Sequence, residues 1–229
     1  MGKQSVVIIG GSSGMGLASA KLLASSGYDV ILGSRSQEKL DKALKEIGSG
    51  KAYVIDVLQE ASIAHFFSLL ESIDHVIITA ADFIMGPFKD LPIEKAKHFF
   101  DSKFWGQYLV AKHCAAKVKP HGTITFFSGI AGNKAVKGLS TAGAINQAIE
   151  GLTRALAIEL LPIRVNAIAP GTIVTPVWDG VPQKQRDAFF QESASKLPVQ
   201  RVGQPEDIAR VAKFLIECFQ YQWLQQVLS

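Results

Sequence analysis

The chain has 229 residues, of which 48% are hydrophobic and 19% are charged. This balance favours one well-filled α/β domain spanning residues 1–229 and excludes a largely disordered chain. The formal net charge is only +4, and the basic residues are scattered along the chain, so no nucleic-acid partner is predicted.

No targeting or metal-binding signal stands out. No apolar run approaches the roughly 18 residues of a membrane span, and the first strand-forming run begins so early that it leaves no room for a signal peptide. The two cysteines, Cys114 and Cys218, fit no metal-ligand spacing. We therefore expect a cytoplasmic protein with reduced thiols, no metal and no membrane partner.

Short apolar runs alternate with amphipathic stretches along the chain. The expected strands cover residues 5–10, 29–34, 51–57, 74–80, 122–128 and 163–170. The expected helices begin at residues 14, 37, 62, 94 and 139, and two further helical segments follow the last of these strands. Because the strands lack polar alternation, both faces of their sheet should be covered. The pattern predicts an α/β fold, a three-layer doubly wound parallel sheet of the Rossmann type.

Residues 175–198 differ in character from the rest of the chain. Three prolines and a glycine surround a short helical stretch there. The segment follows the carboxyl end of an expected strand, which is where open α/β sheets bind ligands. We interpret it as a candidate lid, with a plain surface loop as the alternative.

Three glycines mark the junction between the first expected strand and the first expected helix: Gly10, Gly14 and Gly16. Such glycines let the backbone approach a pyrophosphate and place that anion at the helix N-terminus. Glycine also marks ordinary turns. Here a strand and a helix flank the glycines, so the pattern predicts a dinucleotide-binding site.

Several segments together resemble the short-chain dehydrogenase/reductase family. Residues 9–16 read IGGSSGMG and match the family motif TGxxxGxG apart from its leading threonine. The segments 150–160 (EGLTRALAIEL), 163–176 (IRVNAIAPGTIVTP) and 201–209 (RVGQPEDIA) are also similar to family segments. The resemblance covers nearly the whole chain and implies a nicotinamide-dependent oxidoreductase. Relatives commonly end in a seventh strand, and the final residues QWLQQVLS indicate that this strand is shortened or missing.

The end of the second expected strand indicates which nicotinamide cofactor is bound. NAD-binding proteins place a carboxylate there, whereas this chain has Ser34 and Arg35. A hydroxyl and a guanidinium can bind a 2′-phosphate that a carboxylate would repel. The sequence therefore predicts NADP(H); the alternative is that Arg35 stacks on adenine or lies in solvent.

Other cofactor contacts follow from the resemblance. The family's adenine-binding Asp-Val pair corresponds to Asp56 and Val57, and its carboxamide-binding positions correspond to Ile173 and Thr175. Its NNAG segment is represented by residues 79–82, where the final glycine is replaced by Asp82. The complete expected set is Gly10, Ser12, Ser13, Gly14, Met15, Gly16, Ser34, Arg35, Asp56, Val57, Ala80, Ala81, Lys103, Gly171, Ile173 and Thr175.

The catalytic positions of the family do not match. Its Tyr-x-x-x-Lys pair falls on Ala142 and Asn146, its serine on Gly129 and its asparagine on Lys103, while Ser128 stands one place before the serine position. The usual proton donor is therefore absent.

Two of these changes are reciprocal, because an asparagine has become Lys103 and a lysine has become Asn146. We hypothesise that both side chains fill one polar pocket, with Lys103 binding the nicotinamide ribose. The alternative is independent change, with Lys103 in solvent. Lys103, Asn146 and Ser128 are the candidate catalytic residues.

Apolar residues occupy the segments that should border the substrate pocket: Phe83, Ile84, Met85, Pro87, Phe88, Val177 and Trp178. They indicate a small apolar carbonyl or alcohol substrate, although each also suits a core. Trp105 and Ala148 lie on helix faces that the family uses for subunit contacts, which favours a homodimer or homotetramer.

The sequence leaves two functions open. One is an NADP(H)-dependent oxidoreductase with a rearranged active site. The alternative is a non-catalytic NADP(H)-binding sensor or interaction protein.

Overall fold

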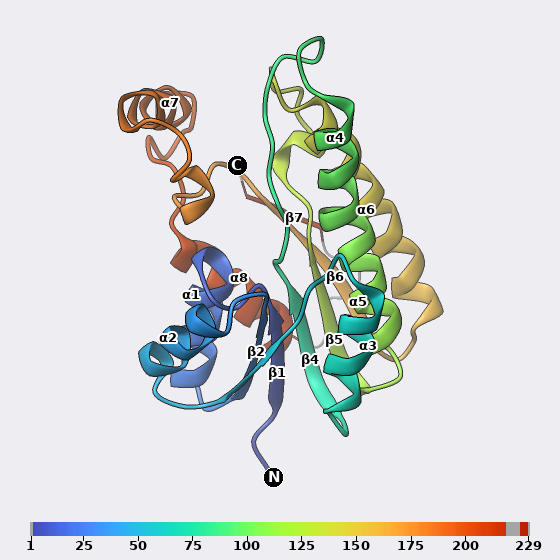
Figure 1. The fold of residues 1–229 in the computed structure, drawn as a ribbon. Coiled ribbons are helices and arrows are strands. Elements are labelled where there is room, and N and C mark those ends of the chain that lie inside the picture. The colour runs from blue at the N-terminus through green and yellow to red at the C-terminus, as the bar shows by residue number, and fades with distance from the viewer. Residues whose placement is uncertain (1, 219–224, 229) are drawn as a thin grey trace.

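The structure is a computed structural model and describes residues 2–218 and 225–228. Its described strands form one sheet in the order β3-β2-β1-β4-β5-β6-β7, and every neighbouring pair is parallel (Figure 1). The strands are β1 (Ser5–Ile9), β2 (Asp29–Ser34), β3 (Lys51–Val54), β4 (Ile73–Ile78), β5 (Val118–Phe127), β6 (Arg164–Pro170) and β7 (Gln225–Leu228).

Helices cover both faces of this sheet (Figure 1). On one face lie α1 (Gly14–Ser25), α2 (Gln37–Ile47) and α8 (Pro205–Glu217). On the other lie α3 (Glu60–Ser68), α4 (Ile93–Phe100), α5 (Gly106–Cys114) and α6 (Ser140–Glu159). A further helix, α7 (Gln183–Ser195), stands apart from these two layers, beyond the carboxyl edge of the sheet.

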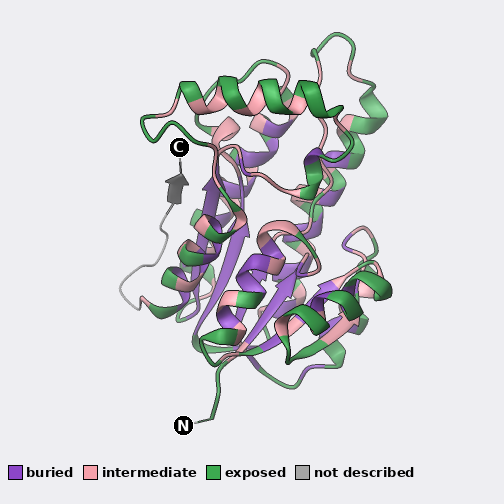
Figure 2. Cartoon of the chain, turned by 90° about the vertical axis from the view of Figure 1, so that its left-hand side faces the viewer, coloured by how far each residue is buried: buried purple, intermediate pink, exposed green. Residues whose placement is uncertain are grey.

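The strand side chains divide between two hydrophobic cores because successive residues of a strand point to opposite faces. Val7 and Ile9 of β1 pack into the core beneath α3, α5 and α6, whereas Val6 and Ile8 pack into the core beneath α1 and α8. Figure 2 shows the central strands as the buried part of the molecule and the outer helix faces as the exposed part. This arrangement explains why the strands read as continuous apolar runs, and it confirms the predicted three-layer, doubly wound fold.

Several boundaries differ from the expected ones, among them the start of β5 at Val118 instead of residue 122, and at β3 and α3 side chains that bind the backbone explain the difference. β3 ends at Val54 instead of residue 57, because the Asp56 carboxylate accepts a hydrogen bond from Leu58 N–H at 3.0 Å and closes a turn. α3 begins at Glu60 instead of residue 62. The Ser62 hydroxyl accepts a hydrogen bond from Asp56 N–H at 3.0 Å and ties the helix to that turn.

The last strand was expected to be shortened or missing, and the structure shows that it is short but present. β7 has four residues and pairs in parallel with residues 167–170 at the end of β6.

In the part of the chain that the structure describes, no helix is both long and apolar enough to cross a membrane.

His75 is a buried titratable residue of β4. Its side chain is 2% exposed, and its Nδ1 lies 2.9 Å from Thr123 Oγ1. Among the described residues its Nε2 has no hydrogen-bond partner. Burial lowers the pKa of His75 from 6.5 to about 4, since the charged imidazolium would lose its hydration there.

This burial makes stability depend on pH in a defined window. Between pH 6.5 and about 4 the unfolded chain binds a proton at His75 that the folded chain does not bind, so the free energy of unfolding falls as the pH falls. The full effect is about 3 kcal/mol. Urea unfolding at pH 7, 5 and 4 should show a smaller pH dependence in His75→Asn than in the unchanged protein. Equal pH dependence in the two proteins would refute this assignment.

Candidate functional site

A cavity of about 1260 Å³ opens at the carboxyl edge of the sheet. All but one of the expected cofactor-binding residues line it, from the glycine turn after β1 to Thr175 after β6. Asp56 is the exception: it lies outside the lining, while its neighbour Val57 is part of it. The three candidate catalytic residues, Lys103, Ser128 and Asn146, line the same cavity.

The turn between β1 and α1 is held by the carbonyl group of Ile9. This oxygen accepts hydrogen bonds from Thr79 N–H at 2.8 Å, Ala80 N–H at 3.0 Å and the Thr79 hydroxyl at 3.1 Å. Gly10 has a φ of +90°, and a Cβ atom on Gly16 would collide with the Gly10 carbonyl oxygen. Only glycine therefore lets β1, α1 and the end of β4 approach so closely.

The start of α1 fits a nucleotide diphosphate. The cap residue Ser13 makes no side-chain capping bond, and the first turn holds no acidic residue. Its backbone N–H groups and the positive end of the helix dipole are therefore available to an anion. Thr175 lies against Gly14, where an added Cβ would be 3.4 Å from the threonine Cβ, so the segment after β6 closes over the same place.

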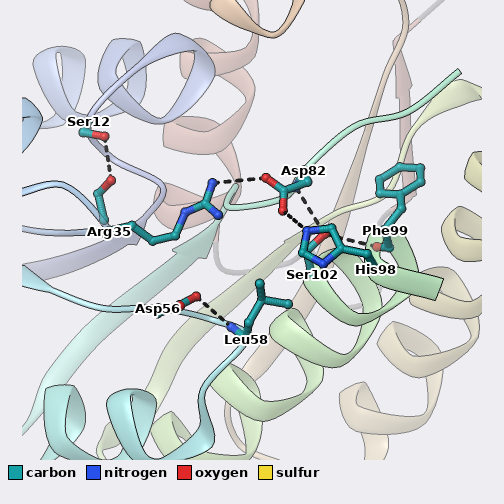
Figure 3. Close-up of polar contacts among 9 residues, drawn as sticks. Ser12, Arg35, Asp56, Leu58, Asp82, His98, Phe99 and Ser102 are labelled. Carbon is teal, nitrogen blue, oxygen red and sulfur yellow. Dashed lines mark hydrogen bonds and ion pairs between the residues drawn. The ribbon is translucent and has the colours of Figure 1, made fainter. Parts of the chain in front are cut away.

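The side chains after β2 form the second part of the site (Figure 3). The hydroxyls of Ser12 and Ser34 share a hydrogen bond of 2.8 Å. Arg35 Nη2 lies 3.1 Å from Asp82 Oδ1, and His98 Nε2 lies 2.9 Å from Asp82 Oδ2. The Arg35 side chain thus reaches from the end of β2 to the segment after β4 (Figure 3). The sequence placed Asp82 near the cofactor, but it gave no sign of these two partners.

Lys103 reaches the deepest polar part of the cavity. It lies in η1 (Asp101–Trp105), a π-helical turn between α4 and α5, and such turns are common at functional sites. Its Nζ donates to Asn146 Oδ1 at 2.7 Å and to Ser128 O at 2.9 Å. Lys103 therefore points inward, and the two residues that look exchanged in the sequence contact each other directly. Burial lowers the pKa of Lys103 to about 8.

Gln107 supports Lys103 and was not identified from the sequence. Its Nε2 donates to Lys103 O and to Phe127 O, both at 3.0 Å, and its Oε1 accepts from Phe127 N–H at 2.9 Å. The amide thus joins the π-helical turn to the end of β5. The available signal was that Gln107 is a polar residue on an otherwise apolar helix face. Nothing in the sequence showed that its partner would be β5.

The backbone carbonyl and the side-chain hydroxyl of Ser128 have different hydrogen-bond partners. Its backbone carbonyl accepts from Lys103, whereas its hydroxyl donates to the buried carboxylate of Glu150 at 3.2 Å. Glu150 also accepts from Asn133 Nδ2 at 3.1 Å. The Ser128 hydroxyl is therefore engaged in a network behind the cavity wall. The sequence did not single out Glu150, because a glutamate on a helix is usually exposed.

Asn146 occupies the space that a side chain at position 129 would need. A Cβ atom added to Gly129 would lie 2.8 Å from Asn146 Nδ2. Ala142, one helical turn before Asn146, is 2% exposed and lines the cavity with a methyl group. Asn146 therefore packs against Gly129 and accepts a hydrogen bond from Lys103, and we call these three residues the packed unit.

Aromatic side chains form the outer wall of the cavity. The ring of Trp178 contacts Phe83, Phe189 and Phe190 at centroid distances of 5.7, 5.0 and 5.6 Å. Trp178, Phe189 and Phe190 all belong to the candidate lid, so the contact between Trp178 and Phe83 fastens the lid to the segment after β4. Of the expected apolar border, Phe83, Met85, Val177 and Trp178 line the cavity; Ile84, Pro87 and Phe88 do not.

The packed unit can be tested with Gly129→Ala. The added methyl group would push Asn146 away from Lys103, so the free energy of unfolding should fall by about 1 to 3 kcal/mol, the usual cost of overpacking. The double variant Gly129→Ala/Asn146→Ala makes room for the methyl group. Its loss of stability in urea unfolding should be smaller than the sum of the two single losses. Additive losses would show that the two positions are independent.

The chain is similar to known proteins over most of its length. The family model described as "Enoyl-(Acyl carrier protein) reductase" matches residues 10–219. The chain is 33% identical to the short-chain dehydrogenase/reductase ATR9 of Stachybotrys chlorohalonatus, over 93% of this chain and 90% of that one. It is 30% identical to the 3-oxoacyl-[acyl-carrier-protein] reductase FabG of Rickettsia prowazekii, over 93% and 89%.

Solved structures show the same likeness. The crystal structure of a small-chain dehydrogenase in complex with NADPH superposes with a TM-score of 0.85 at 35% identity, covering 98% of this chain and 97% of that one. The MalC reductase/Diels-Alderase of Malbranchea aurantiaca superposes with a TM-score of 0.90 at 25% identity, covering 99% and 95%.

Proposed function

Because the chain belongs to the short-chain dehydrogenase/reductase family, whose members use NAD(P)(H), we propose that it is an NADP(H)-dependent oxidoreductase with a rearranged active site. Its substrate is a small apolar carbonyl compound or the corresponding alcohol. One observation carries the proposal: the cavity that begins at the glycine turn ends at the inward-pointing amine of Lys103.

The choice of NADP(H) depends on the groups after β2. Ser12, Ser34 and Arg35 offer two hydroxyls and a guanidinium at the edge of the cavity, and Lys39 lines it nearby. Together they suit a 2′-phosphate. The similar dehydrogenase structure that contains NADPH supports the same choice.

Lys103 takes the place of the missing tyrosine as proton donor. When bound, NADPH would supply the hydride to the carbonyl carbon. An ammonium group carries three hydrogen-bond donors, and among the described residues two acceptors, Ser128 O and Asn146 Oδ1, occupy Lys103 Nζ. The third donor is left for the carbonyl oxygen. Lys103 then passes a proton to that oxygen, and the neutral amine regains a proton from solvent after the product has left.

The aromatic wall supports the proposal of an apolar substrate, because its rings offer an apolar surface that excludes water. Trp178 is 9% exposed, and α7 adds Phe189 to the cavity lining. We propose that residues 175–198 form a lid that closes this wall over the substrate.

We further propose that the protein is a homodimer or homotetramer. The Trp105 side chain is 47% exposed, and its ring packs on Phe104 and Tyr108 at centroid distances of 4.9 and 5.5 Å. This exposed aromatic group is the candidate subunit contact.

Ala142 favours the second function, a non-catalytic NADP(H)-binding sensor or interaction protein. It occupies the sequence position that corresponds to the family's tyrosine, and its methyl group cannot donate a proton. Turnover decides between the two functions. NADPH oxidation should be detectable with members of a panel of aldehydes, ketones and quinones. Tight NADPH binding without any turnover would instead support the sensor.

The Lys103 role predicts the pH dependence of catalysis. Its pKa of about 8 means that the ammonium loses its proton as the pH rises, so kcat/KM for carbonyl reduction should fall above pH 8. Lys103→Met should lower kcat/KM about 10²- to 10⁴-fold and abolish this decline. Lys134→Met removes another lysine of the cavity lining and is the matched control. Unchanged kcat/KM in Lys103→Met would refute the role, provided that NADPH affinity is measured separately.

A further inference from the structure

Arg35, the cation assigned above to the 2′-phosphate, already has an anionic partner in this structure. Its Nη2 lies 3.1 Å from Asp82 Oδ1. Arg35 follows β2 and Asp82 follows β4, and β1 lies between these two strands. The two residues thus follow strands that lie two strand spacings, about 10 Å, apart. Their side chains meet across the edge of the cavity (Figure 3). A 2′-phosphate bound by Arg35 has to compete with this carboxylate.

Asp82 is the fixed member of the pair, and Arg35 is the member that can move. The second carboxylate oxygen lies 2.9 Å from His98 Nε2 on α4, and Asp82 N–H donates to Ser102 Oγ at 3.2 Å. The side chain of Asp82 is 29% exposed, against 60% for that of Arg35. Asp82 therefore keeps His98 as a partner when Arg35 turns toward a ligand.

The other carboxylates of the cavity lining are engaged elsewhere. Asp207 pairs with Arg201 and Arg210 at the start of α8, and Glu192 pairs with Lys196 on α7. Among the described lining residues, Asp82 is thus the one carboxylate that pairs with Arg35. It cancels the charge of the guanidinium on which selection of the phosphorylated cofactor depends.

We propose that Asp82 is a specificity-determining residue, which competes with the 2′-phosphate for Arg35 and narrows the preference for NADPH over NADH. The proposal rests on the proposed function, which places the 2′-phosphate at Ser34 and Arg35. An exposed ion pair is weak, so a phosphate with nearly two negative charges displaces Asp82 but binds less tightly than it would without it.

The test is a pair of binding titrations with the full chain. NADPH and NADH are titrated separately by calorimetry against the unchanged protein, Asp82→Asn and Glu94→Gln. The asparagine keeps the size of the side chain and removes its charge, so NADPH should bind about 2- to 5-fold more tightly while the affinity for NADH stays unchanged. Glu94→Gln removes a carboxylate of α4 that pairs with Lys97, and it should leave both affinities unchanged.

Repeating the Asp82→Asn substitution in a protein that lacks Arg35 isolates the interaction between the two side chains. In Arg35→Gln the gain in NADPH affinity from Asp82→Asn should shrink, because there is no guanidinium left to release. An unchanged ratio of NADPH to NADH affinity in Asp82→Asn overturns the proposal. Equal weakening of both nucleotides also overturns it, since the pair would then act as a clamp over adenosine. If the unchanged protein binds neither nucleotide, the proposed function fails as well.

Discussion

The carbonyl oxygen of Ile9 is the point on which the arrangement of the cavity depends. By accepting three hydrogen bonds from residues 79 and 80, it joins the end of β1 to the end of β4. The close contact between Gly10 and Gly16 then sets where α1 begins. Backbone geometry therefore fixes one wall of the cavity and the helix N-terminus that faces it, before any side chain contributes to binding.

The two ends of the cavity use charge in different ways. At the outer end, Arg35 and Asp82 are partly exposed and can exchange partners at small cost, which suits the selection of a ligand. At the inner end, Lys103 is held by Asn146, Ser128 and, through its backbone, Gln107. Because a buried ammonium is costly to desolvate, its pKa falls toward neutrality, and a lysine in this state exchanges protons readily.

At the inner end of the cavity, three residues fit one another closely. Asn146 fills the space beside Gly129, and its amide oxygen accepts the Lys103 ammonium. A serine at position 129 would meet that amide, and a lysine at position 146 would face a second cation. Lys103, Gly129 and Asn146 are therefore mutually compatible, and neither of these single substitutions would fit among them.

The sequence by itself determined the layers of the fold, the place of the glycine turn and the family resemblance, because periodicity and local motifs are written along the chain. It also identified Lys103 and Asn146 as a related pair. Only the tertiary structure decided that their atoms meet and that the Ser128 carbonyl, not its hydroxyl, takes part. It alone paired Arg35 with Asp82 and placed Gln107 and Glu150 behind the cavity wall. These contacts join residues that are 20 to 47 positions apart in the chain, and no local pattern records which side chains the folded sheet and helices bring together.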